Sequence, residues 1–170
     1  MAVFFTSDTH FGDHRTLNIH KRPFVGVSAM DAELEALWNA TIAADDDVWH
    51  LGDFARNGAR AAQIFGRLNG RKRLLVGNND DAATLNLPWE WVGPYRELEL
   101  GGRFLVLGHY PFRSWNRQHK QAINLHGHSH GKLKSLPRQL DVGVDAHGFA
   151  PVSLEWIMAK LMTPTSSARA

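Results

Sequence analysis

The sequence predicts an α/β protein, a two-layer mixed β-sandwich flanked by helices. Three observations lead to this prediction. The first half of the chain alternates short apolar strands with amphipathic helices, the order that gives parallel strands joined by crossover helices. The second half carries a hairpin signal, in which two apolar runs flank Gly101-Gly102. The 170 residues, 44% hydrophobic and 21% charged, suit one globular domain with a full core.

The first half is expected to hold three strands and two helices. The apolar run that begins at Ala2 ends in polar residues, as a buried strand does where it enters a loop. Ser28, followed by Asp31, has the pattern of a helix cap. The expected elements are a strand over 2–7, a helix over 28–42, a strand over 48–51, a helix over 59–68 and a strand over 72–76.

The second half is expected to add antiparallel strands and a closing helix that Ser153 caps. The expected elements are strands over 96–100, 103–107, 123–125 and 139–144, and a helix over 153–161. Residues 163–170 are small and polar, which is typical of a frayed terminus. We therefore expect one domain over 1–162 and a flexible tail over 163–170.

Composition excludes several classes of protein. The chain has no cysteine, so disulfide frameworks, thiolate metal sites and cysteine nucleophiles are ruled out. The net charge of +2 gives no support to nucleic acid as a partner, because proteins that bind phosphate backbones usually cluster their charge. No apolar run approaches the ~20 residues of a spanning helix. We expect a cytoplasmic protein with no membrane partner; its oligomeric state leaves no readable pattern.

Polar residues follow nearly every expected strand. In open α/β sheets, ligands bind at the carboxyl ends of the strands, so these side chains are expected to converge on one edge. They supply only oxygen and nitrogen donors, a set that suits Mn, Fe, Zn, Co or Ni. The candidate metal ligands are Asp8, His10, Asp53, Asn78, His109, His128 and His130.

Seven candidate ligands are too many for one four-coordinate zinc ion. They suit two ions that share a bridging carboxylate. Two ions ~3.5–4 Å apart hold a bridging hydroxide as nucleophile and polarise a phosphoryl oxygen. The residues thus favour a hydrolytic two-metal site.

Each fragment alone has a plainer explanation. The pair Asp8 and His10 could be a polar strand end, Gly52-Asp53 is a common turn dipeptide, and His128 with His130 could form a surface turn. The functional interpretation depends on their order, with every fragment directly after an expected strand.

The complete series resembles the calcineurin-like metallophosphoesterase superfamily over residues 3–156. The motifs that carry the resemblance are Asp8-x-His10, Gly52-Asp53, Gly77-Asn78-x-Asp80, Gly108-His109 and Gly127-His128-x-His130. The flanking residues, such as His109-Tyr110-Pro111, look like those of small bacterial and phage-type members.

The resemblance implies a βαββ-type sandwich with two divalent metal ions at its strand ends, manganese being favoured. It implies that Asp53 bridges the two ions. The other ligands would divide into two sets: Asp8, His10 and His130 on one ion, and Asn78, His109 and His128 on the other.

One residue departs from the family pattern. The third motif usually reads Gly-Asn-His-Asp/Glu, and here Asn79 stands at the histidine position. An amide can donate a hydrogen bond to a phosphoryl oxygen but cannot transfer a proton near pH 7. Some small members of the superfamily also lack this histidine and favour diesters over monoesters, so Asn79 tilts the prediction towards a phosphodiesterase. Asp80 matches the motif's acid and is expected to orient the ligands.

Further catalytic and substrate-binding candidates have solvated alternatives. His14 lies in the loop after the first strand and could replace the missing proton donor. Arg56 and Arg113 follow candidate ligands closely and could clamp a phosphate. Trp115 could stack on a nucleobase, although most tryptophans belong to the core. His50 and His126 are expected in the core or behind the ligands, and His20, His119 and His147 at the surface.

The leading hypothesis is therefore a dinuclear metal-dependent phosphoric ester hydrolase that prefers phosphodiesters. Its partner would be a small phosphoester, with nucleotides among the candidates. The first alternative is a phosphomonoesterase or nucleotidase of the same fold. The second is a non-catalytic metal-binding scaffold, since a fold does not by itself determine an activity.

Overall fold

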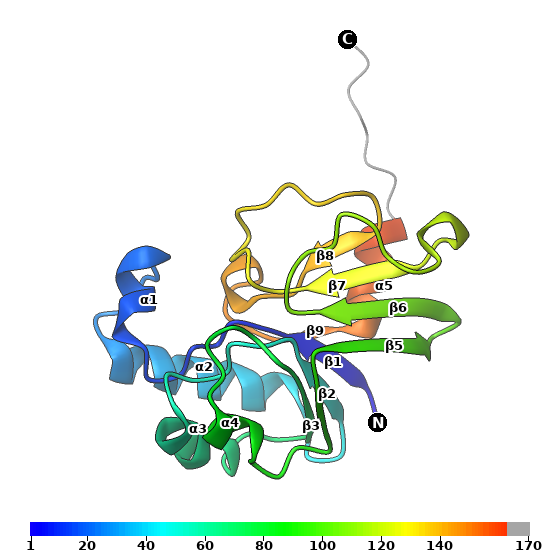
Figure 1. Cartoon of the computed structure of the whole chain (residues 1–170). Coiled ribbons are helices and arrows are strands. Elements are labelled where there is room, and N and C mark those ends of the chain that lie inside the picture. The colour runs from blue at the N-terminus through cyan, green and yellow to red at the C-terminus, as the bar shows by residue number, and fades with distance from the viewer. Residues whose placement is uncertain (163–170) are drawn as a thin grey trace.

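Two β-sheets stack face to face in the computed structural model, which describes residues 1–162 (Figure 1). The first sheet has the strand order β4-β3-β2-β1-β9 and the second has the order β5-β6-β7-β8. The first consists of β1 (Val3–Thr6), β2 (Asp47–His50), β3 (Arg71–Leu75), β4 (Trp91–Gly93) and β9 (Val152–Ser153). The second consists of β5 (Tyr95–Leu100), β6 (Arg103–Gly108), β7 (Ile123–His126) and β8 (Gln139–Asp141).

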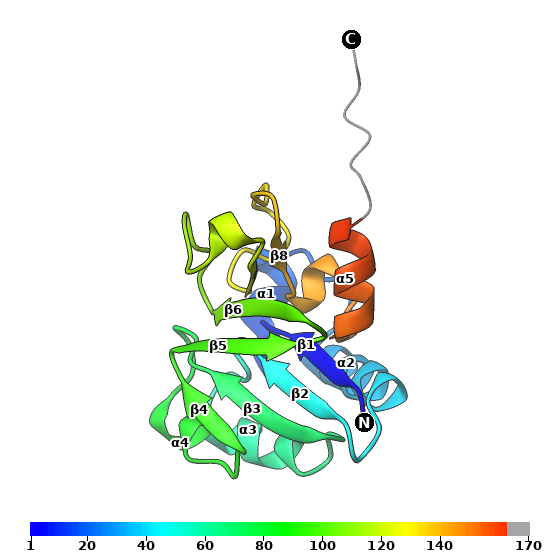
Figure 2. The same ribbon diagram turned by 90° about the vertical axis from the view of Figure 1, so that its right-hand side faces the viewer.

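Helices cover the face of the first sheet that is turned away from the second sheet (Figures 1 and 2). The longest is α2, which packs on this face together with α3. The helices are α1 (His14–Ile19), α2 (Val27–Thr41), α3 (Gly58–Phe65), α4 (Ala82–Leu85) and α5 (Leu154–Met162), with single 3-10 turns η1 (Gln118–Lys120) and η2 (Val144–Ala146). None of the helices described is long and apolar enough to cross a membrane.

Side chains along the strands of the first sheet alternate between its two faces, and each face packs in a separate core. Successive side chains of a strand point to opposite faces. Phe4 and Val48 therefore pack against α2 and α3, while their neighbours Phe5 and Trp49 pack between the two sheets. Burial of both faces explains why these strands are short and apolar.

The predicted strands and crossover helices of the first half are confirmed. Strands β1, β2 and β3 are parallel neighbours, as the alternation of strands and helices indicates. The hairpin is confirmed too: β5 and β6 pair antiparallel around Gly101 and Gly102, whose φ angles of 56° and 70° suit the tight turn. Strands β6, β7 and β8 are parallel neighbours, whereas β9 pairs antiparallel with β1.

Several local predictions need correction. Helix α2 begins at Val27 with Gly26 as its N-cap, so Ser28 is not the cap. Asp31 instead accepts hydrogen bonds from the backbone of Gly12 and from Arg60, because it is buried between α2 and α3. Pattern reasoning also missed α1, α4, β4 and β9, which are all short. The predicted tail over 163–170 lies outside the described residues.

The expected cap of the closing helix is present. The Ser153 hydroxyl accepts a hydrogen bond from the backbone N–H of Trp156 at 3.0 Å. The helix itself begins at Leu154, one residue after its predicted start.

The topology brings the carboxyl ends of several strands to one edge. The arrowheads of β1, β6, β7 and β8 point to the side of the molecule where α1 lies (Figure 1). The loops after β1, β2, β3, β6 and β7 contain all of the candidate metal ligands.

Candidate metal centre

Backbone hydrogen bonds join the loops that carry the candidate ligands. The N–H of Asp8 donates to the carbonyl oxygen of Gly52, and the N–H of His10 donates to that of Asp53, both at 3.0 Å. The second sheet is connected in the same way, since the N–H of Gly127 donates to the carbonyl oxygen of His109 at 2.9 Å. The ligand positions are thus set by main-chain contacts between loops.

A first group of ligand atoms forms around Asp8. Its Oδ1 lies 4.0 Å from Nε2 of His10 and 3.7 Å from Nε2 of His130. The ligand atoms of these three residues all lie within 4.8 Å of one another. This spacing lets the three surround one cation.

A second group forms around Asp53. Its Oδ2 lies 3.7 Å from Nε2 of His109 and 3.5 Å from Nε2 of His10. Oδ1 of Asn78 lies 3.0 Å from the same His109 nitrogen, and the ring of His128 lies 5.1 Å from the His109 ring. Asp53 therefore lies between the two groups, and all seven predicted ligands converge on this edge.

The donor atoms fit divalent cations. Within residues 1–162, Oδ1 of Asp8 and both ring nitrogens of His10 are buried without a hydrogen-bond partner. Buried polar atoms rarely stay unpaired, because each unmet bond costs free energy. Burial raises the pKa of the Asp8 carboxyl well above its usual value, and the charges of Asp53 and Asp141 add to the rise. A cation beside Asp8 would satisfy the unpaired oxygen and favour the ionised carboxylate.

The tautomer of His109 is fixed by its own contact. Its Nδ1 lies 2.7 Å from the carbonyl oxygen of Leu51, which can only accept, so Nδ1 carries the proton. In the neutral ring Nε2 then presents its lone pair to Oδ1 of Asn78, which is also an acceptor. Two lone pairs that face each other suit a shared cation.

Backbone strain concentrates at the site. Ten residues other than glycine have a positive φ between residues 1 and 162, and five of them are candidate ligands. These five are Asp8, His10, Asp53, His128 and His130, with φ between 48° and 64°. Such conformations cost of order 1–3 kcal/mol each and cluster at functional sites, where the surrounding structure holds them.

Gly127 allows the two sheets to meet at the site. A Cβ at this position would overlap the hydroxyl oxygen of Ser7 and approach Oδ2 of Asp8. The backbone N–H of His128, the next residue, donates to that same Asp8 oxygen at 2.9 Å. Any larger residue would separate Asp8 from the loop that carries His128.

Asp145 and Arg22 form a supporting pair that the sequence did not indicate. Oδ2 of Asp145 lies 2.7 Å from Nδ1 of His130, and both of its oxygens accept from the guanidinium of Arg22. Burial opposes its ionisation, but the bonds to His130 and Arg22 prevail and hold the pKa of Asp145 below its usual value. The only signal for Asp145 was an acid directly after a predicted strand.

Asp80 and Asn79 hold the third motif in place. Asp80 accepts hydrogen bonds from the backbone N–H groups of Asp53, Phe54 and Gly77 at 2.8–2.9 Å. Asn79 donates from its backbone to Oδ1 of Asp53 and from its side chain to Oδ2, at 2.8 and 2.7 Å. The Asn79 amide therefore orients the central carboxylate.

Electrostatics around Asp53 favour its ionised form. Burial pushes the pKa of Asp53 upward, but His109, the two Asn79 donors and His10 outweigh it, so the pKa stays below its usual value. Burial also lowers the pKa of His10 to about 4, which keeps the imidazole neutral and able to bind a metal at neutral pH.

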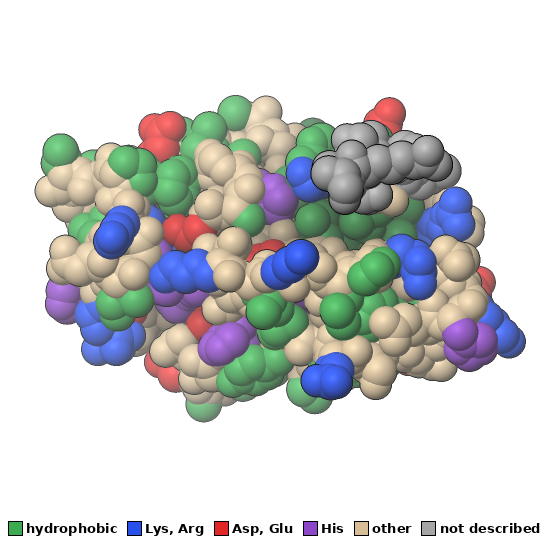
Figure 3. Space-filling view, turned by 90° about the horizontal axis from the view of Figure 1, so that it is seen from above, with side chains coloured by type: hydrophobic (Ala, Val, Ile, Leu, Met, Phe, Trp, Pro, Cys, Tyr) green, Lys and Arg blue, Asp and Glu red, His purple; other side chains and the backbone are tan. Residues whose placement is uncertain are grey.

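An open cavity of about 250 Å³ leads to these ligands. It is lined by His10, Asp13, Arg15, Thr16, Ile19, His20, Asp53, Asn78, Asn79, His128 and His130. In the left half of Figure 3, on the side of α1, acidic and histidine side chains are visible between other surface atoms.

Three residues predicted to act on the substrate do not line this cavity. His14, Arg56 and Arg113 are all exposed. His14 begins α1, and the residue that lines the cavity is its neighbour Arg15, because adjacent helical residues point in different directions. The positions of these three side chains thus give no support to their predicted roles.

Three of the other predictions about single residues need correction. His147 was expected at the surface but is half-buried, and its Nε2 lies 2.6 Å from the carbonyl oxygen of Asp141. His20 was expected at the surface but is half-buried and stacks on His130, with ring centroids 3.5 Å apart. Trp115 is 9% exposed, and its ring nitrogen donates to the carbonyl oxygen of Ala122, so it packs in the core and cannot stack on a base. His50 and His126 are buried, as expected.

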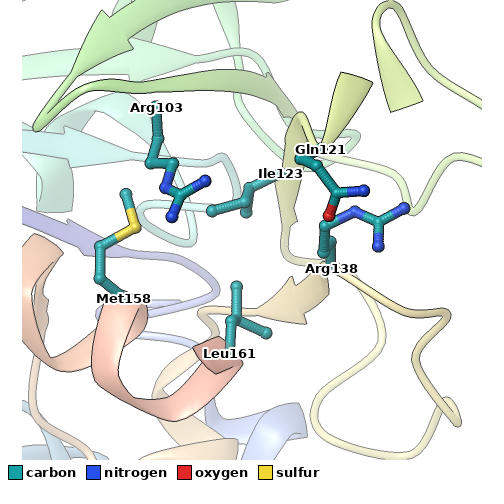
Figure 4. A pocket seen from close by; sticks show the side chains of 6 residues that line it. All are labelled: Arg103, Gln121, Ile123, Arg138, Met158 and Leu161. Atoms are coloured by element: carbon teal, nitrogen blue, oxygen red, sulfur yellow. The ribbon is translucent and has the colours of Figure 1, made fainter. Parts of the chain in front are cut away.

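A second cavity, of about 270 Å³, lies beside α5 (Figure 4). It is lined by Arg103, Gln121, Ile123, Arg138, Met158 and Leu161. It opens near the amino ends of β6 and β7, whereas the candidate ligands follow their carboxyl ends. None of its lining residues is a histidine or a carboxylate, so it is not the metal centre.

Comparison with known proteins finds relatives that match this chain in sequence over most of its length. The gene 66 protein of Mycobacterium phage D29 is 32% identical over 88% of this chain and 92% of its own length. The chain belongs to the family of this phage protein. No family model matches the sequence.

Solved structures share the fold of this family member. A protein of unknown function from Aquifex aeolicus superposes with a TM-score of 0.75 at 21% identity, over 95% of this chain and 99% of its own. A novel archaeal phosphodiesterase superposes with a TM-score of 0.51 at 20% identity, over 84% and 82%. The chain thus shares the fold of a solved phosphodiesterase, as the resemblance found in the sequence leads us to expect.

Proposed function

We propose that this protein is a dinuclear metal-dependent phosphoesterase that prefers phosphodiesters. One observation carries the proposal: Oδ2 of Asp53 lies 3.5 Å from His10 Nε2 and 3.7 Å from His109 Nε2, between two groups of donor atoms. A carboxylate in that position can bridge two ions. In this proposal Asp8, His10 and His130 hold one divalent ion, and Asn78, His109 and His128 hold the other.

Two such ions, with manganese as the first candidate and iron, zinc, nickel or cobalt as alternatives, would supply a hydroxide nucleophile near neutral pH and polarise the phosphoryl oxygen. The chain's own residues prepare the site for this chemistry. Asp145 accepts a hydrogen bond from Nδ1–H of His130 and so directs the Nε2 lone pair inward. The Leu51 carbonyl does the same for His109, and Asn79 keeps the Asp53 carboxylate oriented.

The preference for diesters follows from what Asn79 cannot do. Its side-chain amide is bound to Asp53 and carries no proton that it could transfer near pH 7. His14, the other proposed proton donor, does not line the cavity. Substrates with poor leaving groups should therefore react slowly. The substrate would be a small phosphoester, with nucleotides included. A cytoplasmic location stays a prediction of the sequence.

The test compares a diester with its matching monoester. We would measure initial rates on bis-p-nitrophenyl phosphate and p-nitrophenyl phosphate in excess Mn²⁺ for the wild type and for Asp53→Asn. Asp47→Asn is a matched control, because Asp47 lies at the amino end of β2 and pairs with surface arginines. We expect a preference for the diester that is lost in Asp53→Asn and kept in Asp47→Asn.

Other outcomes would redirect the proposal. A preference for the monoester would keep the metal site and overturn the diesterase. Full activity of Asp53→Asn with full metal content would overturn the bridging role. Bound metal without hydrolysis of either ester would favour a non-catalytic scaffold, although the chain retains all seven candidate ligands.

A further inference from the structure

One segment of the chain forms a side wall of the metal-site cavity. Five of the eleven lining residues come from positions 13–20, which include α1. They are Asp13, Arg15, Thr16, Ile19 and His20. We call this segment the α1 wall. It lies at the end of the molecule beyond the strand ends, beside the loops that hold the ligands (Figure 1).

Contacts at both of its ends fix the α1 wall beside the metal site. His20 stacks on His130 with planes only 10° apart. Its Nδ1 lies 3.2 Å from the ammonium of Lys132, which can only donate, so the ring proton of the neutral His20 is on Nε2. At the other end, the Asp13 carboxylate caps α1 by accepting from the backbone N–H of Arg15 at 3.0 Å. The wall is therefore built, with its two ends anchored.

Arg15 is the one lysine or arginine among the described residues that line the cavity. Its Nε and Nη2 donate to the Asp13 carboxylate at 2.6–3.1 Å, which holds the plane of the guanidinium. Its Nη1 donates to no atom of residues 1–162, and its side chain is 46% exposed. An ion pair so exposed adds little to the stability of the fold. Its effect is to orient the Arg15 guanidinium, so that the Nη1 donor is held at the cavity.

The charge and shape of the α1 wall select among phosphate esters. The Asp13–Arg15 pair is neutral overall. The wall therefore offers a hydrogen bond but no net positive charge that would balance the second negative charge of a phosphate monoester. A monoester is close to a dianion at neutral pH, whereas a diester is a monoanion. Ile19, at 62% exposure, adds an apolar side chain at the rim where a second ester substituent would extend.

We propose that the α1 wall is the substrate-recognition element of this site, with Arg15 binding a non-bridging phosphate oxygen and Ile19 contacting an apolar ester substituent. The inference rests on the proposed phosphoesterase function and names its substrate class, which is phosphodiesters with an apolar ester substituent. It replaces Arg56 and Arg113 as the phosphate-binding arginines, since neither lines the cavity.

The first experiment measures binding, without turnover of a chromogenic ester. Calorimetric titration of the manganese-loaded protein with inorganic phosphate, dimethyl phosphate and diphenyl phosphate would compare the wild type with Arg15→Gln. Arg67→Gln is a matched control. Arg67 donates hydrogen bonds from the same Nε and Nη2 atoms to the Glu35 carboxylate at 2.7–3.1 Å, and its side chain is 50% exposed. Arg67 is not among the residues that line the cavity.

We expect Arg15→Gln to weaken binding of all three anions about tenfold, the usual consequence of losing one charged hydrogen bond, and Arg67→Gln to change none. Metal content and melting temperature should match the wild type in both. Arg15→Lys keeps the positive charge but loses the paired N–H donors of the guanidinium, so its affinity for the anions should lie between those of the wild type and Arg15→Gln. Equal affinities of Arg15→Gln and the wild type would overturn the role of Arg15, as would a wild type that binds none of the anions.

The second experiment tests the apolar contact. Ile19→Ser should weaken binding of diphenyl phosphate severalfold and leave dimethyl phosphate unchanged. Val25→Ser is its control, because Val25 is 102% exposed and does not line this cavity. An equal loss for both diesters would contradict a contact with the substituent.

The two proposals fail in different ways. If the wild type hydrolyses the diester and Arg15→Gln binds and reacts like it, the α1 wall is wrong and the phosphoesterase stands. If the wild type hydrolyses no ester but binds the anions, and Arg15→Gln binds them more weakly, the α1 wall is a binding element and the enzyme proposal fails. In the active enzyme we expect Arg15→Gln to raise KM more than it lowers kcat.

Discussion

Asp145 accepts a hydrogen bond from Nδ1 of His130 over 2.7 Å while both of its oxygens hold Arg22. The Arg22 side chain is fully buried, and its remaining donors bind the carbonyl oxygens of Asp8 and Thr9 at 2.6 and 2.9 Å. Asp145, which lies in η2, thus connects the loop after β1 with the loop after β7 through its bonds to Arg22 and His130. It fixes the tautomer of one candidate ligand and the backbone of another.

Asp145→Asn should therefore weaken metal binding. An amide cannot carry the charge that orients the His130 imidazole, and a lost partner of this kind typically lowers metal affinity about 10–100-fold. The buried charge of Arg22 would also lose its carboxylate partner and face a neutral amide, so the melting temperature should fall. Calorimetric titration with Mn²⁺ checks the affinity, with Asp47→Asn as the control. An unchanged affinity in a folded variant would refute the supporting role.

Asp8→Asn should stabilise the protein in EDTA and destabilise it relative to the wild type in Mn²⁺. The raised pKa of Asp8 means that the folded state binds its proton more tightly than the unfolded state. Stability from this group is thus present at low pH and lost as pH rises through the raised pKa. At pH 8 we expect the variant to melt at least about 3 °C above the wild type in EDTA, as ~1 kcal/mol would give.

Asparagine suits this position for a second reason, since it tolerates the positive φ of 56° at Asp8. The exposed Asp45 provides the control variant Asp45→Asn, which should melt like the wild type in both buffers. If Asp8→Asn melts lower than the wild type in EDTA as well, the Asp8 carboxylate is not an unpaired buried charge.

Asn79→Ala should make metal binding more sensitive to acid. The Asn79 side chain is one of the groups that hold the pKa of Asp53 low, so its removal should raise that pKa. A carboxylate that protonates more readily loses the metal earlier as pH falls. We expect the affinity for Mn²⁺ relative to the wild type to fall about tenfold at pH 5 and less at pH 8. Equal losses at both pH values would mean that Asn79 acts on geometry alone.

His50 should make the protein sensitive to acid through burial. Its Nε2 lies 2.9 Å from the Thr9 hydroxyl oxygen, which itself donates to the carbonyl oxygen of Phe54, so Nε2 of His50 donates to Thr9. Burial lowers the pKa of His50 to about 3. The unfolded chain binds this proton below about pH 6.5 and the folded protein does not, so stability falls as pH drops from about 6.5 towards 3.

The slope from one such group is about 1.4 kcal/mol per pH unit. His50→Gln keeps a donor for Thr9 and has no group that titrates, so the free energy of unfolding should fall less between pH 7 and pH 5 than in the wild type. Urea unfolding in EDTA measures both. His119→Gln, at an exposed position, should retain the full slope of the wild type. The same slope in His50→Gln would place the titration elsewhere.

Sequence patterns predicted most of the strands, and the convergence of the candidate ligands, for a physical reason. A buried strand needs apolar residues on both faces, so runs such as 2–7 and 48–51 are visible without any structure. Parallel strands end at one edge of a sheet, so the polar residues that follow them, Asp8 and Asp53 among them, were expected to converge. All seven predicted ligands do converge.

The residues that pattern reasoning missed have no local pattern. Arg22, Asp145 and His20 lie in loops and short turns, and their partners are up to 123 positions away. The direction of an arginine in a loop depends on which carboxylate the fold brings beside it. For that reason the phosphate-binding role moved from Arg56 and Arg113 to Arg15 in the present proposals.

By itself the sequence determined the α/β class, most of the strands and the identity of the donor atoms, because these depend on periodicity and on chemistry that each residue carries alone. Only the tertiary structure decided that Asp53 lies between two groups of donors, that Asp145 supports His130, and that α1 closes one side of the cavity. These are distances between loops, and loops are placed by packing and hydrogen bonds from the whole fold.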